Sequence, residues 1–300
     1  AAWSAQLRVI ARQFSPKLEV LLATAATEEE KRDVCMALAG LHAEEPTVLV
    51  RLLNTFPPSS VPLIVSALQS HPNTHELLGN IQPPPRSAAE NKSKKSLLLS
   101  TAQEATSIGY SNTLLASACL GLDEKLWPAL NRNGDRTLRT FLILNAASSG
   151  LPPQLLVDRL TTETDPGRSQ ALLLMLSSYP PSALSAALQE RVFMWLRQNY
   201  VTEPDGGVHS SIATLMKHWS LKAELAEIQK TLPATPEPQP GMGWWVTPSG
   251  LDMRIIRMAD GRRVAVSACE VTVQEYRRFR KEKQFSDQPA PDVDAPVTAL

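Results

Sequence analysis

The chain has few aromatic residues, few cysteines and no net charge, and each shortage excludes a class of protein. Phe, Trp and Tyr make up only 5% of its 300 residues, so aliphatic side chains and alanine must supply most of the core. Lysine plus arginine and aspartate plus glutamate number 30 each, so the chain lacks the positive charge with which nucleic-acid-binding proteins hold phosphates. No apolar run approaches the roughly 18 residues of a membrane span, and no signal-peptide pattern is visible. By length, about two globular domains are expected.

The cysteines and two of the histidines offer no metal site. Three cysteines are too scattered for a disulfide framework or a metal knuckle: Cys35, Cys119 and Cys269. The four-residue spacing of His71 and His75 suits two ligands on one helix face, but Pro72-Asn73 stands between them and no second ligand pair is near. We therefore interpret this segment as a helix-capping turn.

The remaining reactive side chains also favour structural roles. His209 and His218 flank a helix whose apolar face lies between them, which predicts surface or interhelical positions. Cys269 stands next to Glu270, which invites a nucleophile interpretation, but the alternation of Val-Ser-Ala-Cys favours a small buried residue in a strand. Acidic residues are dispersed, and no glycine-rich phosphate loop is present. The sequence thus predicts no catalytic, cofactor-binding or metal-binding residue.

Residues 1 to about 231 show the apolar period of an α-helix. Thr27 and Glu30 form a capping box ahead of an apolar run. Four further stripes each place apolar residues on one helix face: Val61, Ile64, Val65 and Leu68; Leu172, Met175, Leu176 and Tyr179; Val208, Ile212, Leu215, Met216 and Trp219; and Leu221, Leu225, Ile228 and Leu232. We expect Leu176 and Trp219 in the core.

Two kinds of turn recur between these helices. Leu53-Asn-Thr-Phe-Pro-Pro-Ser-Ser-Val61 returns as Leu176-Ser-Ser-Tyr-Pro-Pro-Ser-Ala-Leu184. An aspartate suited to cap a helix precedes apolar runs at Asp135, Asp165 and Asp205, with spacings of 30 (165 − 135) and 40 (205 − 165). Helix pairs at periods of ~30–45 residues are typical of a HEAT- or armadillo-like α-solenoid. An irregular helical bundle is the alternative.

Two polar segments interrupt the helices. Residues 82–96 are rich in proline and end in Lys92, Lys94 and Lys95, which predicts a flexible surface loop rather than a nucleic-acid patch, since no aromatics are interleaved. Residues 232–243 form a proline-rich linker.

After the linker the pattern becomes β-like. Arg254-Ile-Ile-Arg-Met258 and Arg263-Val-Ala-Val266 flank Asp260-Gly261, which predicts a two-stranded hairpin. Thr272 and Glu275 then form a capping box for a helix to about Lys283.

Several ordered segments resemble one group of large bacterial proteins. They are Leu120-Gly-Leu-Asp-Glu-Lys-Leu-Trp-Pro-Ala-Leu130, Asp165-Pro-Gly-Arg-Ser-Gln-Ala-Leu-Leu-Leu174, Gly207-Val-His-Ser210 through Lys217-His-Trp219, Trp244-Trp245-Val246 and the strand, Glu-Val-Thr and helix sequence after it. In these proteins HEAT-like repeats precede a formylglycine-generating-enzyme-like (sulfatase-modifying-factor-like) domain, often with a serine/threonine kinase domain and a membrane segment. The resemblance implies a fragment with repeats over 1–231 and the incomplete second domain over 244–300.

The resemblance also implies roles for four matched positions, Glu270, Val271, Thr272 and Tyr276. Thr272 would cap a helix, while Val271 and Tyr276 would pack. The family binds copper through a cysteine pair in its C-terminal half. That segment is absent here, so we expect no cofactor in this chain and copper only in a parent that has the pair.

Two functions remain open at this stage. The first is a non-catalytic helical scaffold that binds protein partners, in a bacterial signalling or regulatory protein. The second is the client-positioning part of a formylglycine-generating oxidase acting on a cysteine of a sulfatase-like protein. The sequence indicates no nucleic-acid partner and does not indicate a compartment.

Overall fold

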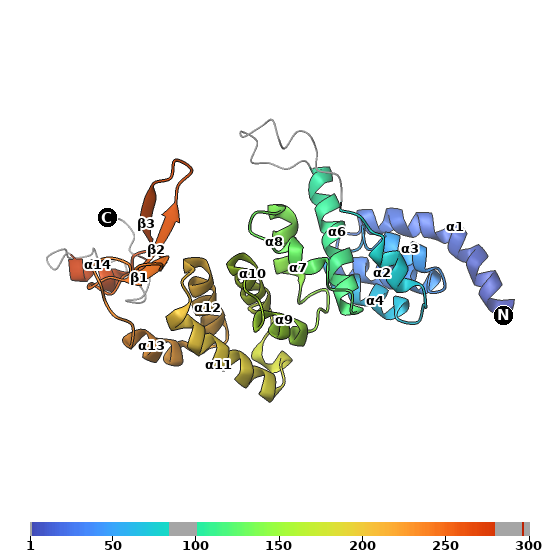
Figure 1. Cartoon of the computed structure of the whole chain (residues 1–300). Helices are drawn as coiled ribbons and strands as arrows, with labels where there is room; N and C mark the ends of the chain where they lie inside the picture. Colours follow the sequence, from blue (N-terminus) through green and yellow to red (C-terminus); the bar gives the residue numbers. More distant parts are fainter. Residues whose placement is uncertain (1, 84–100, 280–295, 297–300) are drawn as a thin grey trace. The chain divides into compact units, whose positions relative to one another are not determined.

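The computed structural model describes residues 2–83, 101–279 and 296, and it is mainly helical. Those residues form fourteen α-helices and a three-stranded antiparallel sheet near the C-terminus (Figure 1). No helix among them is long and apolar enough to cross a bilayer. The chain divides into two compact units, Ala1–Ala183 and Leu184–Leu300. The second unit therefore contains the last helices of the repeat-like region together with the sheet.

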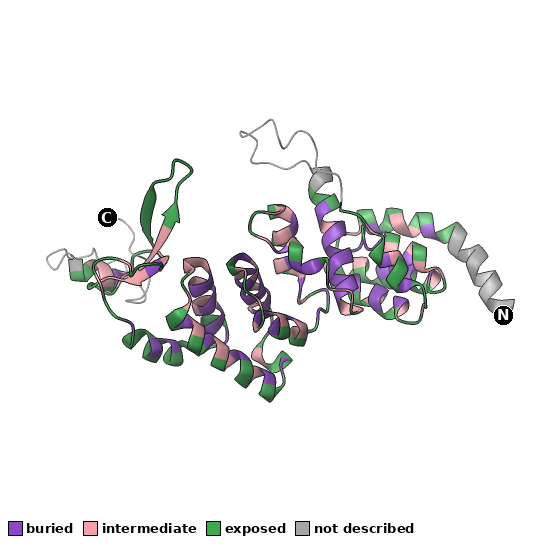
Figure 2. Ribbon diagram, in the orientation of Figure 1, coloured by how far each residue is buried: buried purple, intermediate pink, exposed green. Residues whose placement is uncertain are grey.

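The first unit consists of helices joined by short turns. Its helices are α1 (Ala2–Thr24), α2 (Glu28–Leu41), α3 (Pro46–Leu52), α4 (Val61–Leu68), α5 (Thr74–Gly79), α6 (Thr101–Cys119), α7 (Leu126–Ala129), α8 (Arg136–Asn145), α9 (Pro153–Leu160) and α10 (Pro166–Leu176). The consecutive helices α1 and α2 pack together, α6 packs against α4 and α8, and α10 packs against α8 and α9. Figure 2 shows much of α6 and α10 as buried. The expected stripes on α4 and α10 are buried, including Leu176.

The predicted helix starts are confirmed. Thr27 and Glu30 form the capping box of α2, with both bonds present. Asp135, Asp165 and Asp205 cap α8, α10 and α12 (Gly206–His218), because each side-chain Oδ1 accepts from the backbone N–H three residues on. Both Pro-Pro-Ser segments form a 3₁₀ turn, Pro58–Ser60 and Pro181–Ala183.

The described residues of the second unit form four helices and the three-stranded sheet. Its helices are α11 (Ala186–Thr202), α12, α13 (Lys222–Lys230) and α14 (Val273–Phe279), and its strands are β1 (Trp244–Val246), β2 (Asp252–Arg257) and β3 (Arg263–Ser267). Helix α12 packs against both α11 and α13. The apolar stripe of α12 is buried, including Trp219, and on α13 Leu225 and Ile228 are buried while Leu221 is half-buried.

The hairpin turn and the last capping box are confirmed, but the number of strands is not. Gly261 has a φ of 85°, which glycine adopts without strain. Thr272 and Glu275 exchange the bonds of a capping box at the start of α14. The expected two-stranded hairpin is a three-stranded sheet, since β1 pairs with β2. A three-residue strand gives almost no periodic signal.

The start of the sheet is hydrogen-bonded to the link between α11 and α12. The Trp244 indole N–H donates to the Glu203 carbonyl at 2.7 Å, and the Gly243 N–H donates to the Pro204 carbonyl at 2.8 Å. Trp244 is only 5% exposed. The proline-rich segment is tied to the sheet as well, because Ala234 bridges Val246.

Two packing expectations near the C-terminus are wrong. Cys269 is exposed and lies in a bend after β3, because the strand ends at Ser267 before its alternation can bury the thiol. Val271 is 37% exposed, and the buried valine is Val273, which starts α14. Of the loop predicted at 82–96, residues 84–96 lie outside the described residues, as does the predicted helix extension from 280 to 283.

Candidate functional site

The histidines and cysteines considered as ligands do not converge. A His71 ring nitrogen lies 2.6 Å from the Ala43 carbonyl, His75 is exposed, and the turn between α4 and α5 is closed by a bond from the Thr74 hydroxyl to the Leu68 carbonyl. Cys35 is buried, and burial raises the pKa of the Cys119 thiol to about 11. In the part of the chain that the structure describes, no group of three or more His, Cys, Asp or Glu residues could hold a metal ion.

His209 is the most deeply buried of the five histidines. It is fully buried against α11, which agrees with the interhelical alternative and not with the surface one, whereas His218 is exposed. Its ring is stacked between Tyr200 of α11, at a centroid distance of 4.1 Å, and Trp244 of β1, at 3.6 Å. We name these three rings the aromatic stack. It joins two helices and the sheet, and so holds the second unit together.

The hydrogen bonds of His209 fix its neutral form. Its Nδ1 lies 2.8 Å from the Tyr200 carbonyl, which can only accept, so Nδ1 carries the proton. Nε2 has no hydrogen-bond partner among the described residues, and the nearest acid, Asp252, is 3.8 Å away. Burial, followed by the positive charge of Arg254, lowers the pKa of His209 to about 4. The ring is therefore a structural element at neutral pH, not a proton-transfer group.

Asp252 and Arg254 enclose the aromatic stack from the sheet side. The two side chains form a bidentate ion pair within β2. The Arg254 Nε donates to the Ser210 hydroxyl at 2.6 Å, and the guanidinium lies 6.0 Å from the centre of the Trp244 ring. These contacts tie β2 to the first turn of α12. The Arg254 side chain therefore stabilises the contact between the sheet and α12.

A groove runs between α11 and α13 in the same unit. We name it the α11–α13 groove, and its volume is about 450 Å³. Its walls are Phe193, Arg197 and Val201 from α11, and Glu224, Glu227 and Ile228 from α13 with Thr231, which caps that helix. The α11 residues follow one another at intervals of four and so share one helix face. The two walls are linked by a bond from the Gln229 side chain to the Tyr200 hydroxyl at 3.1 Å. The groove is therefore held at one side by a member of the aromatic stack.

The groove combines apolar and charged surface. Val201 is 38% exposed, Phe193 is half-buried, and Met194, which follows it on α11, is 55% exposed. Arg197 stands on one wall, while Glu224 and Glu227 stand on the other, all three exposed. Opposite charges thus flank an apolar strip.

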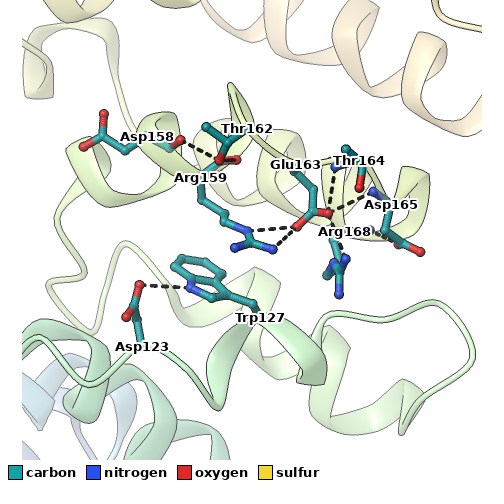
Figure 3. Close-up of polar contacts among 9 residues, drawn as sticks. All are labelled: Asp123, Trp127, Asp158, Arg159, Thr162, Glu163, Thr164, Asp165 and Arg168. Atoms are coloured by element: carbon teal, nitrogen blue, oxygen red, sulfur yellow. Dashed lines mark hydrogen bonds and ion pairs between the residues drawn. The ribbon is translucent and has the colours of Figure 1, made fainter.

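A separate buried charge cluster stabilises a turn in the first unit (Figure 3). The side chain of Glu163 is only 1% exposed and contacts Arg159 at 2.6 Å and Arg168 at 2.9 Å. It also accepts from the backbone N–H groups of Thr164 and Asp165, both at 2.9 Å. Burial alone raises the pKa of Glu163. The hydrogen bonds from these four donors together outweigh burial, so the pKa is lowered to about 2.

The cluster continues from Arg159 to Trp127 of α7. The Arg159 guanidinium lies 5.5 Å from the centre of the Trp127 ring, and the indole N–H donates to Asp123 at 2.9 Å. The charges of Glu163 and the two arginines are paired with one another around the turn between α9 and α10. The cluster therefore has a structural role, and we assign it no catalytic one.

The comparisons with known proteins find no match for the chain. No family model matches it, and neither curated proteins nor solved structures show significant similarity to it.

The sequence did not predict the groove or the aromatic stack. The stripe of Phe193, Arg197 and Val201 is a signal that a search for exposed as well as buried stripes would have found.

Proposed function

We propose that the chain is a non-catalytic helical-repeat scaffold and that the α11–α13 groove is where a protein partner docks. The observation that carries the proposal is the groove itself, with its apolar strip between walls of opposite charge. An amphipathic helix laid in a groove is a recurring way in which helical proteins recognise partners. The partner is then a helix with apolar residues about one turn apart, acidic residues toward Arg197 and basic residues toward Glu224, since Glu227 already pairs with Lys230 at 2.6 Å.

A small molecule is a poorer occupant of the same groove. Sites for small molecules place a few buried, convergent polar groups in a largely enclosed pocket. Here the polar groups are long side chains on exposed helix surfaces. Such groups match a partner whose own side chains span both walls.

The finer architecture belongs to the same proposal. The recurring Asp-capped turns and Pro-Pro-Ser turns support stacked helical pairs of the HEAT or armadillo type. The β2–β3 hairpin followed by the Thr272-capped helix supports the beginning of a formylglycine-generating-enzyme-like domain. In that arrangement the chain is part of a bacterial signalling or regulatory protein, and its repeats present surfaces to other proteins.

The test uses three labelled 18-residue helical peptides that share one leucine stripe. One carries Glu on the flank facing Arg197 and Lys on the other, the second exchanges these charges, and the third has neutral polar flanks. We expect fluorescence anisotropy to rank the first peptide tightest. Val201→Arg should weaken its binding by about tenfold, because a charge enters the apolar strip.

Leu144→Arg is the matched control. Leu144 is a similarly exposed apolar residue of α8, at 64%, and it lies outside the groove. The proposal is wrong if no peptide binds, or if both variants weaken binding equally.

A further inference from the structure

Strand β3 lies at the edge of the sheet, and some of its backbone groups pair with no other strand among the described residues. The sheet order is β1-β2-β3, so only β2 pairs with it. The Met258 N–H donates to the Arg262 carbonyl and the Ala268 N–H donates to the Asp252 carbonyl, both at 2.8 Å. Along an antiparallel ladder, residues that bond to the neighbouring strand alternate with residues that point away from it. Between Arg262 and Ala268, Val264 and Val266 therefore bond to β2. The backbone groups that point away from β2 are those of Arg263, Ala265 and Ser267.

The opposite edge of the sheet is protected, whereas the β3 edge is not. At β1, Ala234 bridges Val246, and the Thr235 N–H donates to the Val246 carbonyl. No described segment bridges the outer side of β3. Proteins usually block such an edge with proline, a bulge or a covering segment, because it otherwise pairs with another strand.

The side chains of the hairpin are exposed and apolar on one face. Val264 and Val266 are 40% and 42% exposed, and Ile256, which pairs with Val264, is 47% exposed. Figure 2 shows most of the β2–β3 hairpin as exposed. On the same face, Val266 pairs with Arg254, whose side chain packs against Ser210 and Trp244. This face of the hairpin is therefore packed at Arg254 and exposed at Ile256 and Val264. An added strand would extend a face that is already partly buried.

The other face of the hairpin has an unneutralised pair of charges. Arg257 and Arg263 are directly opposite each other in the β2–β3 register, and both are exposed. Like charges at such positions destabilise a sheet. Within the described residues neither forms an ion pair, whereas neighbouring Arg262 pairs with Asp260 at 2.7 Å. A carboxylate beside Arg263 would relieve the repulsion.

From the free backbone edge, the bare valines and the paired arginines, we propose that β3 binds an extended acidic segment of another protein by strand addition. The incoming strand exchanges backbone bonds with Arg263, Ala265 and Ser267. It places apolar side chains beside Val264 and Val266 and an acidic side chain beside Arg263. The preferred partner therefore alternates acidic or polar residues with valine-like residues.

A second copy of the chain fits this edge less well. The symmetric antiparallel register centred on Ala265 places Ser267 of one copy opposite Arg263 of the other. That arrangement supplies backbone bonds but no carboxylate. The charge of the arginine pair is the reason to favour an acidic partner.

The test uses the full chain and a labelled peptide, acetyl-Ser-Glu-Val-Thr-Val-Glu-Ser-amide, whose core reads the same in both strand directions. We expect it to bind at least about tenfold more tightly than the same peptide with Lys in place of Glu. Arg263→Glu should reverse this preference. Ala265→Pro should weaken both peptides by about tenfold, because it removes an outward N–H while leaving the β2–β3 ladder intact.

The controls separate the proposed contacts from general effects. Arg136→Glu changes the net charge equally from α8, and Ala265→Ser changes the size of the same side chain; both should leave binding unchanged. Val201→Arg should also leave it unchanged, so failure at β3 does not bear on the α11–α13 groove. Were Ala265→Pro to unfold the sheet, as judged by tryptophan fluorescence, the charge reversal at Arg263 would still decide.

Three outcomes would overturn the proposal. They are an absence of binding by the acidic peptide, equal binding of the Glu and Lys peptides, and a concentration-dependent dimer in sedimentation that Ala265→Pro converts to monomer. The last result would identify a second copy as the occupant.

Discussion

At the residue scale, the carboxylate of Glu163 shows how one buried charge can determine a turn. Its oxygens satisfy two backbone N–H groups of the turn and two guanidinium groups, those of Arg159 in α9 and Arg168 in α10. A buried charge is costly unless it is fully paired, and here every contact is made by the charged form. The turn between α9 and α10 is therefore built around an ionised side chain.

Glu163→Gln should lower the free energy of unfolding of the first unit by about 2 kcal/mol, because a neutral amide weakens the charge-assisted bonds to Arg159 and Arg168, both of which are half-buried. Amide hydrogen exchange of α9 and α10, measured at increasing urea concentration, would measure this. Glu124→Gln, at an exposed position of the same unit just before α7, is the control and should change it by less than about 0.5 kcal/mol. Equal effects of the two substitutions would show that the Glu163 contacts contribute little.

The sequence predicts the local environment of such residues better than their distant partners. The capping roles of Thr27, Asp165 and Thr272 depend on neighbours within three residues, and all are confirmed. His209 is different, because its environment is made by Tyr200 and Trp244, which are 9 (209 − 200) and 35 (244 − 209) residues away. No local pattern encodes that stack.

At the element scale, helices follow from the sequence and the sheet does so only in part. An apolar stripe and a capping residue are both contained within one helix, which is why α4, α10 and α12 could be predicted. Strand β1 is three residues long and is defined by its pairing with β2. The groove arises in the same way, since its walls come from helices separated by α12.

The contact between the start of α12 and the segment before β1 depends on glycine. A Cβ on Gly206 would lie 2.9 Å from the Gly243 carbonyl oxygen, which is closer than real Cβ atoms approach backbone. Gly206→Ala should therefore push β1 away from α12 and destabilise the second unit by roughly 1–3 kcal/mol. Thermal unfolding monitored by tryptophan fluorescence would report it.

Gly40→Ala is the control for this substitution. Gly40 lies within α2, and its Cβ would meet no heavy atom within 4 Å. Alanine is the better helix former, so stability should stay unchanged or rise by up to about 1 kcal/mol. If Gly206→Ala behaves in the same way, the sheet is not held by this close approach.

At the scale of the whole molecule, the two units should respond differently to acid. The pKa of His209 is about 4 in the folded protein, below its ordinary value of 6.5. The unfolded chain therefore takes up a proton below pH 6.5 that the folded chain cannot take up until about pH 4. Stability from this group is complete above pH 6.5 and is lost as the pH falls toward 4. The pKa of Glu163 is about 2 against 4.5, so the first unit loses its contribution between pH 4.5 and 2.

The second unit should accordingly weaken before the first, by up to about 3 kcal/mol from His209 between pH 6.5 and 4. Amide hydrogen exchange measured by mass spectrometry at pH 7 and pH 5 would resolve the units within one molecule, after correction for the intrinsic pH dependence of exchange. We expect protection in α11, α12 and β1 to fall selectively at pH 5.

The variant His209→Gln tests the assignment, because it keeps a side-chain donor toward the Tyr200 carbonyl but cannot titrate. It should lower stability at pH 7, because stacking is lost, and should flatten the pH dependence of the second unit. An equally steep acid dependence in this variant would show that another group, not His209, sets the response.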